Sequence, residues 1–330
     1  MRSCQHGLTH ALCLGACLWA CAVASAQYQT GFEPPTFTGS ADGTVLSGQD
    51  GFYLPPGTES VDFLVYTYAG NTLGLPPNPA GGDEQFAAGT GPAQAPRARA
   101  QRDMDWGSGT WTITYDVATT YLWNPPAQNN IGSFSPQPHP DSASYIHLFI
   151  WVDVANPVTW NAFYAAFNAA GEADEAPRSP GPEWENLEID HWYRFATTLD
   201  FDLNRIAEVS ITDLTTGVST THAPPDWYMS GGAAGNPAPT AFRLYAGSRI
   251  YGNTVAWDNL SISSSECIGD LNGDGVTDLS DLAEMLGTYG KCPGDAGYNP
   301  VANLIENEPP DGCIDLSDLA ELLGDYGCGT

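Results

Sequence analysis

The sequence predicts a mainly β protein, an antiparallel β-sandwich of the jelly-roll type followed by a small α-helical, calcium-loop domain at the C-terminus. Three observations support this prediction. The 330 residues include 36 glycines and 26 prolines with only 15% charged residues, a composition typical of turn-rich β domains. Short alternating segments recur between residues 31 and 263. A helical pattern occurs twice near the C-terminus.

The first 26 residues have the pattern of an export signal. Arg2 supplies a positive start, residues 11–23 are apolar, and Ala24-Ser25-Ala26 is a small-residue cleavage site. The apolar run is shorter than the roughly 20 residues of a membrane span. We therefore expect a secreted, extracellular chain without a transmembrane segment. The alternative is a lipid anchor and cell-surface attachment, because residues 14–17 resemble a lipobox.

The charge balance excludes two classes of partner. The chain has 39 acidic and 10 basic residues and a formal net charge of −29. Nucleic acids and anionic membranes both require basic patches, so neither is an expected partner. The many carboxylates are instead suited to calcium, the expected cofactor.

The most specific motif is a loop that starts at Asp270. Oxygen-bearing side chains occupy its positions 1, 3, 5, 9 and 12, and Gly275 stands at position 6. This is EF-hand spacing, in which alternate residues of a tight loop point at one cation. A solvated acidic turn is the alternative. The expected calcium ligands are Asp270, Asn272, Asp274, Val276 (through its carbonyl), Asp278 and Asp281.

The segment after this loop is duplicated. Residues 278–290 (DLSDLAEMLGTYG) and residues 315–327 (DLSDLAELLGDYG) differ at only two of 13 positions. The apolar residues within each copy have helical spacing, so a helix is predicted in both.

The second loop departs from the first. A gap-free alignment back from Asp318 puts Asn307 and Pro309 at positions 1 and 3, whereas an alignment from Asp295 requires about a dozen inserted residues. Both alignments predict a weak or absent second calcium. Three carboxylates remain as a possible second metal site: Asp311, Asp315 and Asp318.

The tail, residues 265–330, resembles the dockerin type I family, on the loop motif and the duplicated segments. The resemblance implies two calcium-loop-and-helix repeats that dock onto a cohesin-like or other cell-surface protein. The Ser/Thr pair on which partner choice depends in that family is replaced by Leu279-Ser280 and Leu316-Ser317. An ordinary cohesin is therefore not the expected partner.

All four cysteines beyond the predicted export signal lie in the tail. An exported domain with an even number of cysteines is expected to be disulfide-bonded, and four cysteines allow three pairings. The dockerin resemblance implies that the two ends of the module meet, which favours Cys267 with Cys328 and Cys292 with Cys313. Sequential pairing is the alternative.

Residues 27–264 are predicted to form the sandwich. Trp111, Ile113, Tyr115 and Val117 alternate with polar residues, which is the period of a half-buried strand. Further strands are expected at residues 61–68, 144–152, 192–201, 205–214 and 254–263.

One helix is predicted to interrupt the strands, over residues 156–171. Asn156 can cap it, Pro157 suits its first turn and Gly171 can end it. Four aromatic residues would then share one face, either packed on the sheet or exposed as a binding platform: Trp160, Phe163, Tyr164 and Phe167.

The sandwich segment resembles the concanavalin A/laminin G class, on residues 192–201 and 255–260. The resemblance implies glycan binding and a structural calcium between the first and last strands, with Glu33 and Asp258 as candidate ligands. Strict alternation puts Asp258 on the same face as Leu260, where a carboxylate needs a partner. The alternative is a carboxylate bonded to backbone amides.

Catalysis is not the favoured interpretation. Glu188 and Asp190 are weak candidates, since alternate strand residues share a face and glycoside hydrolases need paired carboxyls. Laminarinase-like hydrolases have a second Glu shortly after such a pair, where this chain has Trp192 and Tyr193.

Sugar binding requires exposed aromatic rings. Trp123, Trp184 and Trp227 lie in proline-rich, loop-like segments and are the candidates for stacking on polysaccharide. We expect a secreted protein whose sandwich binds glycan or another surface ligand and whose calcium tail docks. A polysaccharide-degrading glycoside hydrolase and a purely structural exoprotein are the alternatives.

Overall fold

The computed structural model describes residues 28–326 with internal gaps, and these residues separate into a sandwich unit that ends at Cys267 and a C-terminal unit that begins at Ile268. The predicted export signal lies outside the described residues. No helix in the described part of the chain is long and apolar enough to cross a membrane. The gaps are residues 57–59, 82–83, 91–96, 105, 107–108, 121–129, 138–146, 153–158, 173–177, 238, 247–253, 265–266, 273–276 and 306–311.

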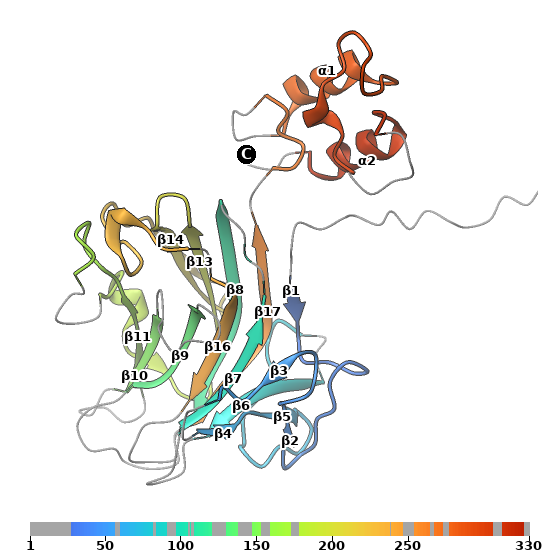
Figure 1. Cartoon of the computed structure of the whole chain (residues 1–330). Helices are drawn as coiled ribbons and strands as arrows, with labels where there is room; N and C mark the ends of the chain where they lie inside the picture. The colour runs from blue at the N-terminus through green and yellow to red at the C-terminus, as the bar shows by residue number, and fades with distance from the viewer. Residues whose placement is uncertain are drawn as a thin grey trace, which may run out of the picture. The chain divides into compact units, whose positions relative to one another are not determined.

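Two sheets of nine and eight described strands form the sandwich unit, as the composition predicts (Figure 1). Every pairing is antiparallel except that of β4 with β7. The nine-stranded sheet has the order β15 (Ser219–His222), β14 (Arg205–Asp213), β13 (Tyr193–Asp200), β8 (Thr110–Thr120), β17 (Thr254–Ser264), β6 (Gln85–Thr90), β5 (Leu64–Thr67) and β2 (Thr44–Val45), and β1 (Tyr28–Thr30) pairs with β17. The eight-stranded sheet has the order β12 (Leu187–Glu188), β11 (Thr159–Ala165), β10 (His147–Val152), β9 (Asn130–Gln137), β16 (Ala241–Ala246), β7 (Arg97–Asp103) and β3 (Phe52–Tyr53), and β4 (Ser60–Asp62) pairs with β7.

The main core lies between the two sheets and is rich in aromatic residues. Tyr115 of β8 packs against Phe134 of β9, with ring centroids 4.9 Å apart, and against Trp257 of β17 at 5.3 Å. The alternation predicted for β8 is confirmed, because Trp111, Tyr115 and their apolar partners are buried. Burial of these apolar side chains between the two sheets stabilises this unit.

The helix predicted over residues 156–171 is wrong, because Thr159–Ala165 form strand β11. Trp160, Ala162 and Tyr164 are buried and the residues between them are less so, which is the period of a strand. Pairing with β10 and β12 satisfies the backbone on both sides. The aromatic residues have high strand propensity, and the four-residue spacing of Trp160 and Tyr164 fits both a helix and a strand.

In the last strand, β17, the alternation of core-facing and outward-facing residues is interrupted halfway along. Val255 and Trp257 belong to the core between the sheets, and so do Leu260 and Ile262. A β-bulge between Asp258 and Ser261 inverts the alternation, with Asn259 in the left-handed region at φ 47°. Asp258 therefore does not share a face with Leu260, contrary to the prediction.

The C-terminal unit contains the two predicted helices, α1 (Leu279–Thr288) and α2 (Leu316–Gly324), and a short 3-10 turn at Pro300–Ala302. Asp278 and Asp315 are the N-caps and accept hydrogen bonds from Ser280 and Ser317. Its small core consists of Leu271, Met285, Ala302, Ile314 and Leu322.

Candidate functional site

The outer face of the eight-stranded sheet is polar. On β7, Ala98 and Ala100 point into the core, so Arg99, Gln101 and Asp103 point outward. The strand register places Tyr53 and Arg243 beside Gln101, with Tyr245 beside Arg99. We call the following set the polar face: Tyr53, Arg99, Gln101, Asp103, Ser133, Ser135, Arg243 and Tyr245.

A chain of hydrogen bonds crosses three strands of this face. Arg243 donates from Nε and Nη2 to Oε1 of Gln101, at 2.9 and 2.5 Å. The Gln101 amide nitrogen donates to the Tyr53 hydroxyl at 2.7 Å, and that hydroxyl donates to Oδ1 of Asp103 at 2.6 Å. Gln101 is 0% and Arg243 is 6% exposed. Each bond in such a chain polarises the next, so the side chains are held in one arrangement.

The Tyr53 hydroxyl stays protonated at neutral pH, because its pKa is raised. Burial raises the pKa of Tyr53 above its usual value, and the hydrogen bond to the Asp103 carboxylate raises this pKa further. On the neighbouring row, Arg99 donates to Ser60 Oγ and its guanidinium lies 5.8 Å from the centre of the Tyr245 ring. The polar face therefore combines cationic, amide and hydroxyl groups, of which those of Tyr53, Arg99 and Asp103 are partly or fully exposed and those of Gln101 and Arg243 are buried.

None of the residues of this face is among the site residues predicted from the sequence. The signal was present in the segment Arg-Ala-Arg-Ala-Gln-Arg-Asp, residues 97–103, where small apolar and long polar residues alternate. Alanines are weak markers of a buried strand face, so the period-2 pattern was not recognised as a strand.

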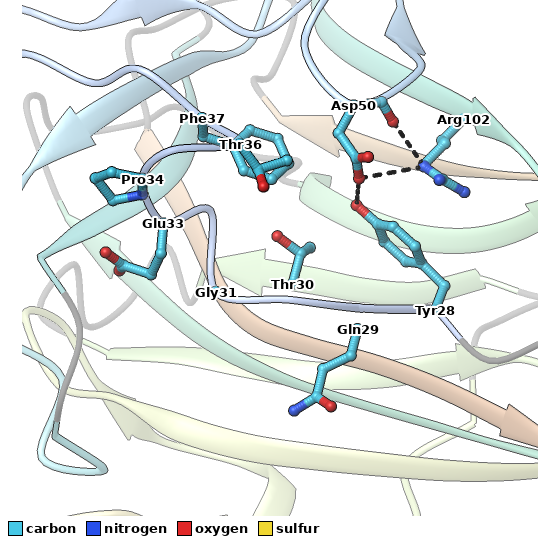
Figure 2. A pocket seen from close by; sticks show the side chains of 10 residues that line it. All are labelled: Tyr28, Gln29, Thr30, Gly31, Glu33, Pro34, Thr36, Phe37, Asp50 and Arg102. Carbon is cyan, nitrogen blue, oxygen red and sulfur yellow. Dashed lines mark hydrogen bonds and ion pairs between the residues drawn. The ribbon is translucent and has the colours of Figure 1, made fainter. Parts of the chain in front are cut away.

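A pocket of about 450 Å³ lies beside β1 and β7 (Figure 2). Arg102 stacks over the Tyr28 ring at 3.9 Å and donates to the Asp50 carbonyl, and the Tyr28 hydroxyl donates to Asp50 Oδ2 at 2.8 Å. Burial, followed by the Asp50 hydrogen bond, raises the pKa of Tyr28. Glu33 also lines this pocket, and its carboxylate accepts from the amides of Glu84 and Gln85.

Asp258, the second predicted ligand of the structural calcium, is buried on the outer face of the nine-stranded sheet. Its carboxylate accepts from the Tyr68 hydroxyl at 2.7 Å and from the Asn78 amide at 3.3 Å. On the adjacent strand, buried Asp116 accepts two bonds from Arg194, at 2.7 and 2.9 Å. Glu33 and Asp258 thus have separate protein partners, and a calcium held by both stays a prediction.

Two of the three tryptophans predicted to stack on sugars are buried. Trp184 is 1% exposed and Trp227 is 6% exposed, and both belong to the core cluster of the sandwich. Neither has an exposed ring face, so the stacking prediction is wrong for these two, because their proline-rich segments pack onto the sheets. Trp123 lies outside the described residues.

The weak catalytic candidates Glu188 and Asp190 do not form a carboxylate pair on one strand. Glu188 ends β12, and Asp190 follows in a turn with φ 53°. Glu188 and Asp103 lie on one sheet but five strands apart, about 24 Å at normal strand spacing. Paired carboxyls of glycoside hydrolases are at most about 9.5 Å apart.

Of the first predicted calcium loop, the structure describes residues 270–272 and 277–281. Asp281 is buried and accepts from the amides of Leu271, Asn272 and Asp278, at 2.8, 3.1 and 2.9 Å. Burial acts to raise the pKa of Asp281, but these amide bonds outweigh it and lower the pKa. The described donors, Asp270, Asn272, Asp278 and Asp281, are hard oxygens and fit calcium. Asp274 and Val276 lie outside the described residues.

The second repeat has the same three hydrogen bonds, made to Asp318. Asp318 accepts from the amides of Leu304, Ile305 and Asp315, at 2.8, 3.1 and 2.8 Å. The sequence separations are 14 and 13 residues, against 10 and 9 in the first repeat, so the second loop is four residues longer. Asn303 is then the counterpart of Asp270. Both sequence alignments of this loop differ from this equivalence, because neither takes Asn303 as the first loop position.

This equivalence bears on the possible second metal site. The counterpart of Asn272, loop position 3, is Ile305, which has no side-chain oxygen. Asp315 caps α2 and Asp318 accepts from three amides, as Asp278 and Asp281 do in the first repeat, and Asp311 lies outside the described residues.

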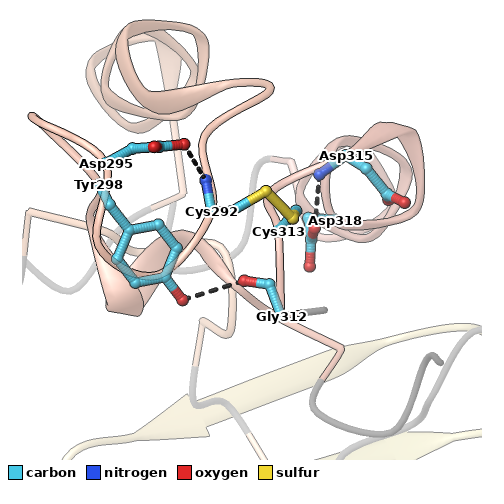
Figure 3. The surroundings of a disulfide bond; sticks show 7 residues. All are labelled: Cys292, Asp295, Tyr298, Gly312, Cys313, Asp315 and Asp318. Atoms are coloured by element: carbon cyan, nitrogen blue, oxygen red, sulfur yellow. Dashed lines mark hydrogen bonds between the residues drawn. A yellow bond between two sulfur atoms is a disulfide. The ribbon is translucent and has the colours of Figure 1, made fainter. Parts of the chain in front are cut away.

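A disulfide joins Cys292 to Cys313 at this loop (Figure 3). Next to it, the Cys292 amide donates to Asp295 at 2.9 Å and the Tyr298 hydroxyl donates to the Gly312 carbonyl at 3.1 Å. Cys267 is also disulfide-bonded. Its expected partner, Cys328, lies outside the described residues.

Comparisons with known proteins find no matching family model and no matching curated protein. Several solved structures are similar in fold, with identities of 13–14% and TM-scores of 0.37–0.38. At these values the likenesses support no argument about activity.

Three of these structures illustrate the range. The catalytic domain of a glycoside hydrolase family 131 protein from Coprinopsis cinerea is 14% identical with a TM-score of 0.37, over 64% of this chain and 83% of its own. Endo-beta-1,4-glucuronan lyase from Trichoderma reesei is 13% identical at 0.37, over 68% and 94%. The cellulose-induced protein Cip1 is 14% identical at 0.38, over 72% and 97%.

Proposed function

We propose that the sandwich unit is a polysaccharide-binding domain and that the polymer lies along the polar face. The supporting observation is the hydrogen-bonded chain on the side of the sheet that faces away from the core, in which the buried Gln101 and Arg243 fix the position of the partly exposed Tyr53. Buried polar groups rarely improve stability over apolar ones. Sugar hydroxyls both donate and accept, so they match amide, guanidinium and hydroxyl groups held in fixed positions.

The test uses the chain from residue 27 to residue 330 with calcium and a panel of insoluble polysaccharides. We expect at least one polymer to deplete the protein from solution and free oligosaccharide to reverse the depletion. Gln101→Ala should abolish binding, whereas Glu188→Gln, on an exposed residue of the same sheet, should not. No depletion by any polymer would contradict the proposal.

A second candidate is a polysaccharide-degrading enzyme. The observation that favours it is the 2.6 Å contact between the Tyr53 hydroxyl and the Asp103 carboxylate on the same face. A protonated phenol beside a carboxylate is a pair that can transfer protons to a bound sugar. New reducing ends released from a bound polymer, and lost in Asp103→Asn while binding persists, would establish this candidate.

For the tail, we propose a calcium-dependent docking module of an exported protein. The repeats expose large apolar residues at equivalent positions, which suits contact with a cohesin-like or cell-surface protein. A disulfide fits an extracellular location. The exposed pairs are Leu279 and Leu316, Leu286 and Leu323, and Tyr289 and Tyr326.

Calcium titration by calorimetry tests the module. We expect one calcium per chain, bound by the first loop. Asp270→Ala should remove it, and the matched control is Asn303→Ala, at the equivalent position of the second loop. Asp281→Ala should also abolish calcium-dependent ordering, but it removes the acceptor of three amides and loosens the loop without calcium as well. Two calcium ions per chain, or full affinity in Asp270→Ala, would contradict the assignment.

A further inference from the structure

The duplicated segments of the tail differ in one polar residue. One of their two differences exchanges Met285 for Leu322, and both side chains are buried in the core of the C-terminal unit. The other exchanges Thr288 for Asp325, a hydroxyl for a carboxylate. The Thr288 hydroxyl is bonded to residues 297–299, which precede the second loop. The Asp325 carboxylate is therefore the polar group of this segment that can give the second repeat a role of its own.

This carboxylate contacts the first calcium loop. A single oxygen, Oδ2 of Asp325, accepts from the Gly269 amide at 2.7 Å and from the Thr277 hydroxyl at 2.7 Å. Thr277 is 0% exposed, and a methyl group on Gly269 would lie only 2.5 Å from the Thr277 side chain. Asp325 lies 56 and 48 positions further along the chain than these two residues, so the two bonds join the second repeat to the first.

The two bonded groups lie next to predicted calcium ligands. Gly269 directly precedes Asp270, the ligand at loop position 1. Thr277 stands between Val276 and Asp278, the ligands at positions 7 and 9. A carboxylate that holds the backbone at both points keeps the loop in shape without itself being a ligand. Removal of such outer partners typically weakens metal binding by about 10- to 100-fold.

The backbone of Asp325 is in turn fixed by α2. Asp325 is the C-cap of this helix, and its amide donates to the carbonyls of Glu321 and Leu322 at 3.1 and 3.2 Å. The next residue is Tyr326, one of the exposed residues of the proposed docking surface. Order in the first loop and order at the end of α2 are therefore linked through one side chain.

We propose that Asp325 is a positioning residue of the first calcium loop and couples calcium binding there to the end of α2. A loop whose ligands are held by the cation also holds Asp325 and the last turn of α2. By linkage, an ordered α2 end raises the calcium affinity of the loop by the same factor. The second repeat then responds to calcium although its own loop has Ile305 at position 3. This inference rests on the proposed calcium-dependent docking module and names how its second repeat is controlled.

The experiment measures calcium affinity by calorimetry on the chain from residue 27 to residue 330. Asp325→Ala should weaken binding about tenfold. Asp325→Asn keeps an acceptor oxygen without the charge and should lie between. Thr277→Val removes the hydroxyl donor and keeps the carboxylate, so it should also weaken binding. The two changes combined should weaken binding by less than the product of the single effects, because both remove the same hydrogen bond.

Glu284→Gln is the matched control for charge. It removes an equal charge from an exposed residue of α1, the helix that begins within the first loop, and should change the affinity by less than about twofold. Thermal unfolding with and without calcium identifies a purely structural role. A side chain that only stabilises the unit would lower the unfolding temperature of both forms alike and leave the calcium affinity unchanged.

A measurement on the unmodified protein tests the coupling directly. Amide hydrogen exchange, with and without saturating calcium, reports local order at the end of α2. We expect calcium to slow the exchange of the amides of residues 322–326 several-fold. This slowing should be absent in Asp325→Ala.

The outcomes separate the coupling from the proposed module. The coupling would be overturned by unchanged affinity in Asp325→Ala, by an equal loss in Glu284→Gln, or by independent losses in Asp325→Ala and Thr277→Val. Calcium without effect on exchange at the end of α2 would also overturn it. Each of these results would leave a one-calcium module standing. An unmodified chain that binds no calcium would overturn both proposals.

Discussion

The outer faces of the two sheets use buried polar groups in opposite ways. On the nine-stranded sheet, Asp116 neutralises Arg194, and a second apolar cluster that includes Leu75, Phe86 and Trp192 covers the face. The chain after β5 supplies this cover, since Trp192 donates to the Pro76 carbonyl at 2.9 Å. On the eight-stranded sheet, the central arginine meets an amide.

We expect the polar groups of the nine-stranded sheet to have a structural role and those of the eight-stranded sheet to have a role in recognition. The charges of Asp116 and Arg194 match, and removal of the buried carboxylate leaves the arginine without this partner. The glutamine amide that accepts from Arg243 instead fixes the direction of its guanidinium within the polar face. Substitutions on the first face should therefore change stability alone, and those on the second should change binding as well.

The largest expected effect is on the nine-stranded side. Asp116→Ala removes the acceptor of Arg194, Asn78 and Asn259, and should lower the free energy of unfolding by about 3 kcal/mol. Urea unfolding measures this loss. The control is Asp226→Ala, whose pair with Arg178 at 3.5 Å is exposed and worth less than about 1 kcal/mol. Similar losses in the two variants would refute the structural role of Asp116.

Gln101→Ala should have a smaller effect on stability. It leaves Arg243 and Tyr53 without one hydrogen-bond partner and should cost about 1–2 kcal/mol. Unlike Asp116→Ala, it should also weaken polysaccharide binding, as depletion assays would show. The control is Gln29→Ala, at an exposed residue. Unchanged binding in Gln101→Ala would remove the contrast between the two faces.

Alkaline pH should destabilise both faces. Burial is the largest cause that raises the pKa of Tyr53 on one face and of Tyr66 on the other. Above the unfolded value of about 10, the unfolded chain loses protons that the folded chain keeps, so stability falls as pH rises. The loss should be below about 1 kcal/mol per pH unit for Tyr53, which is partly exposed. Unfolding at pH 9, 10 and 11 measures it, and an identical slope in Tyr53→Phe would contradict the assignment.

The smallest expected effect is at Glu188. Glu188→Gln should change the free energy of unfolding by less than about 0.5 kcal/mol, because the side chain is exposed at the end of β12. Binding and any release of reducing ends should be unchanged. Loss of either in this variant would move the functional site to the β12 end of the sheet.

The sequence predicts the sandwich where apolar and polar residues alternate clearly. β8, β13, β14 and β17 were expected within a few residues of their observed ends. The repeated helices and their Asp caps were also expected, because their pattern is local.

The errors come from contacts that no local pattern contains. The stripe at Trp160 and Tyr164 fits a helix and a strand equally, and pairing with β10 decides between them. The face of Asp258 depends on one extra residue in a bulge. The polar face assembles from β3, β7, β9 and β16, and their order follows from topology.

Asp318 closes its loop at the base, with one carboxylate joining Leu304 and Ile305 to the start of α2. Loop length is therefore uncoupled from the fold of the module, and lengthening a loop costs little entropy once its ends are fixed. In the duplicated tail, the copy with the longer loop has room to accept new sequence. Natural variation can build a new contact there, and a peptide tag or fluorescent label can be inserted there while the first loop keeps its calcium motif.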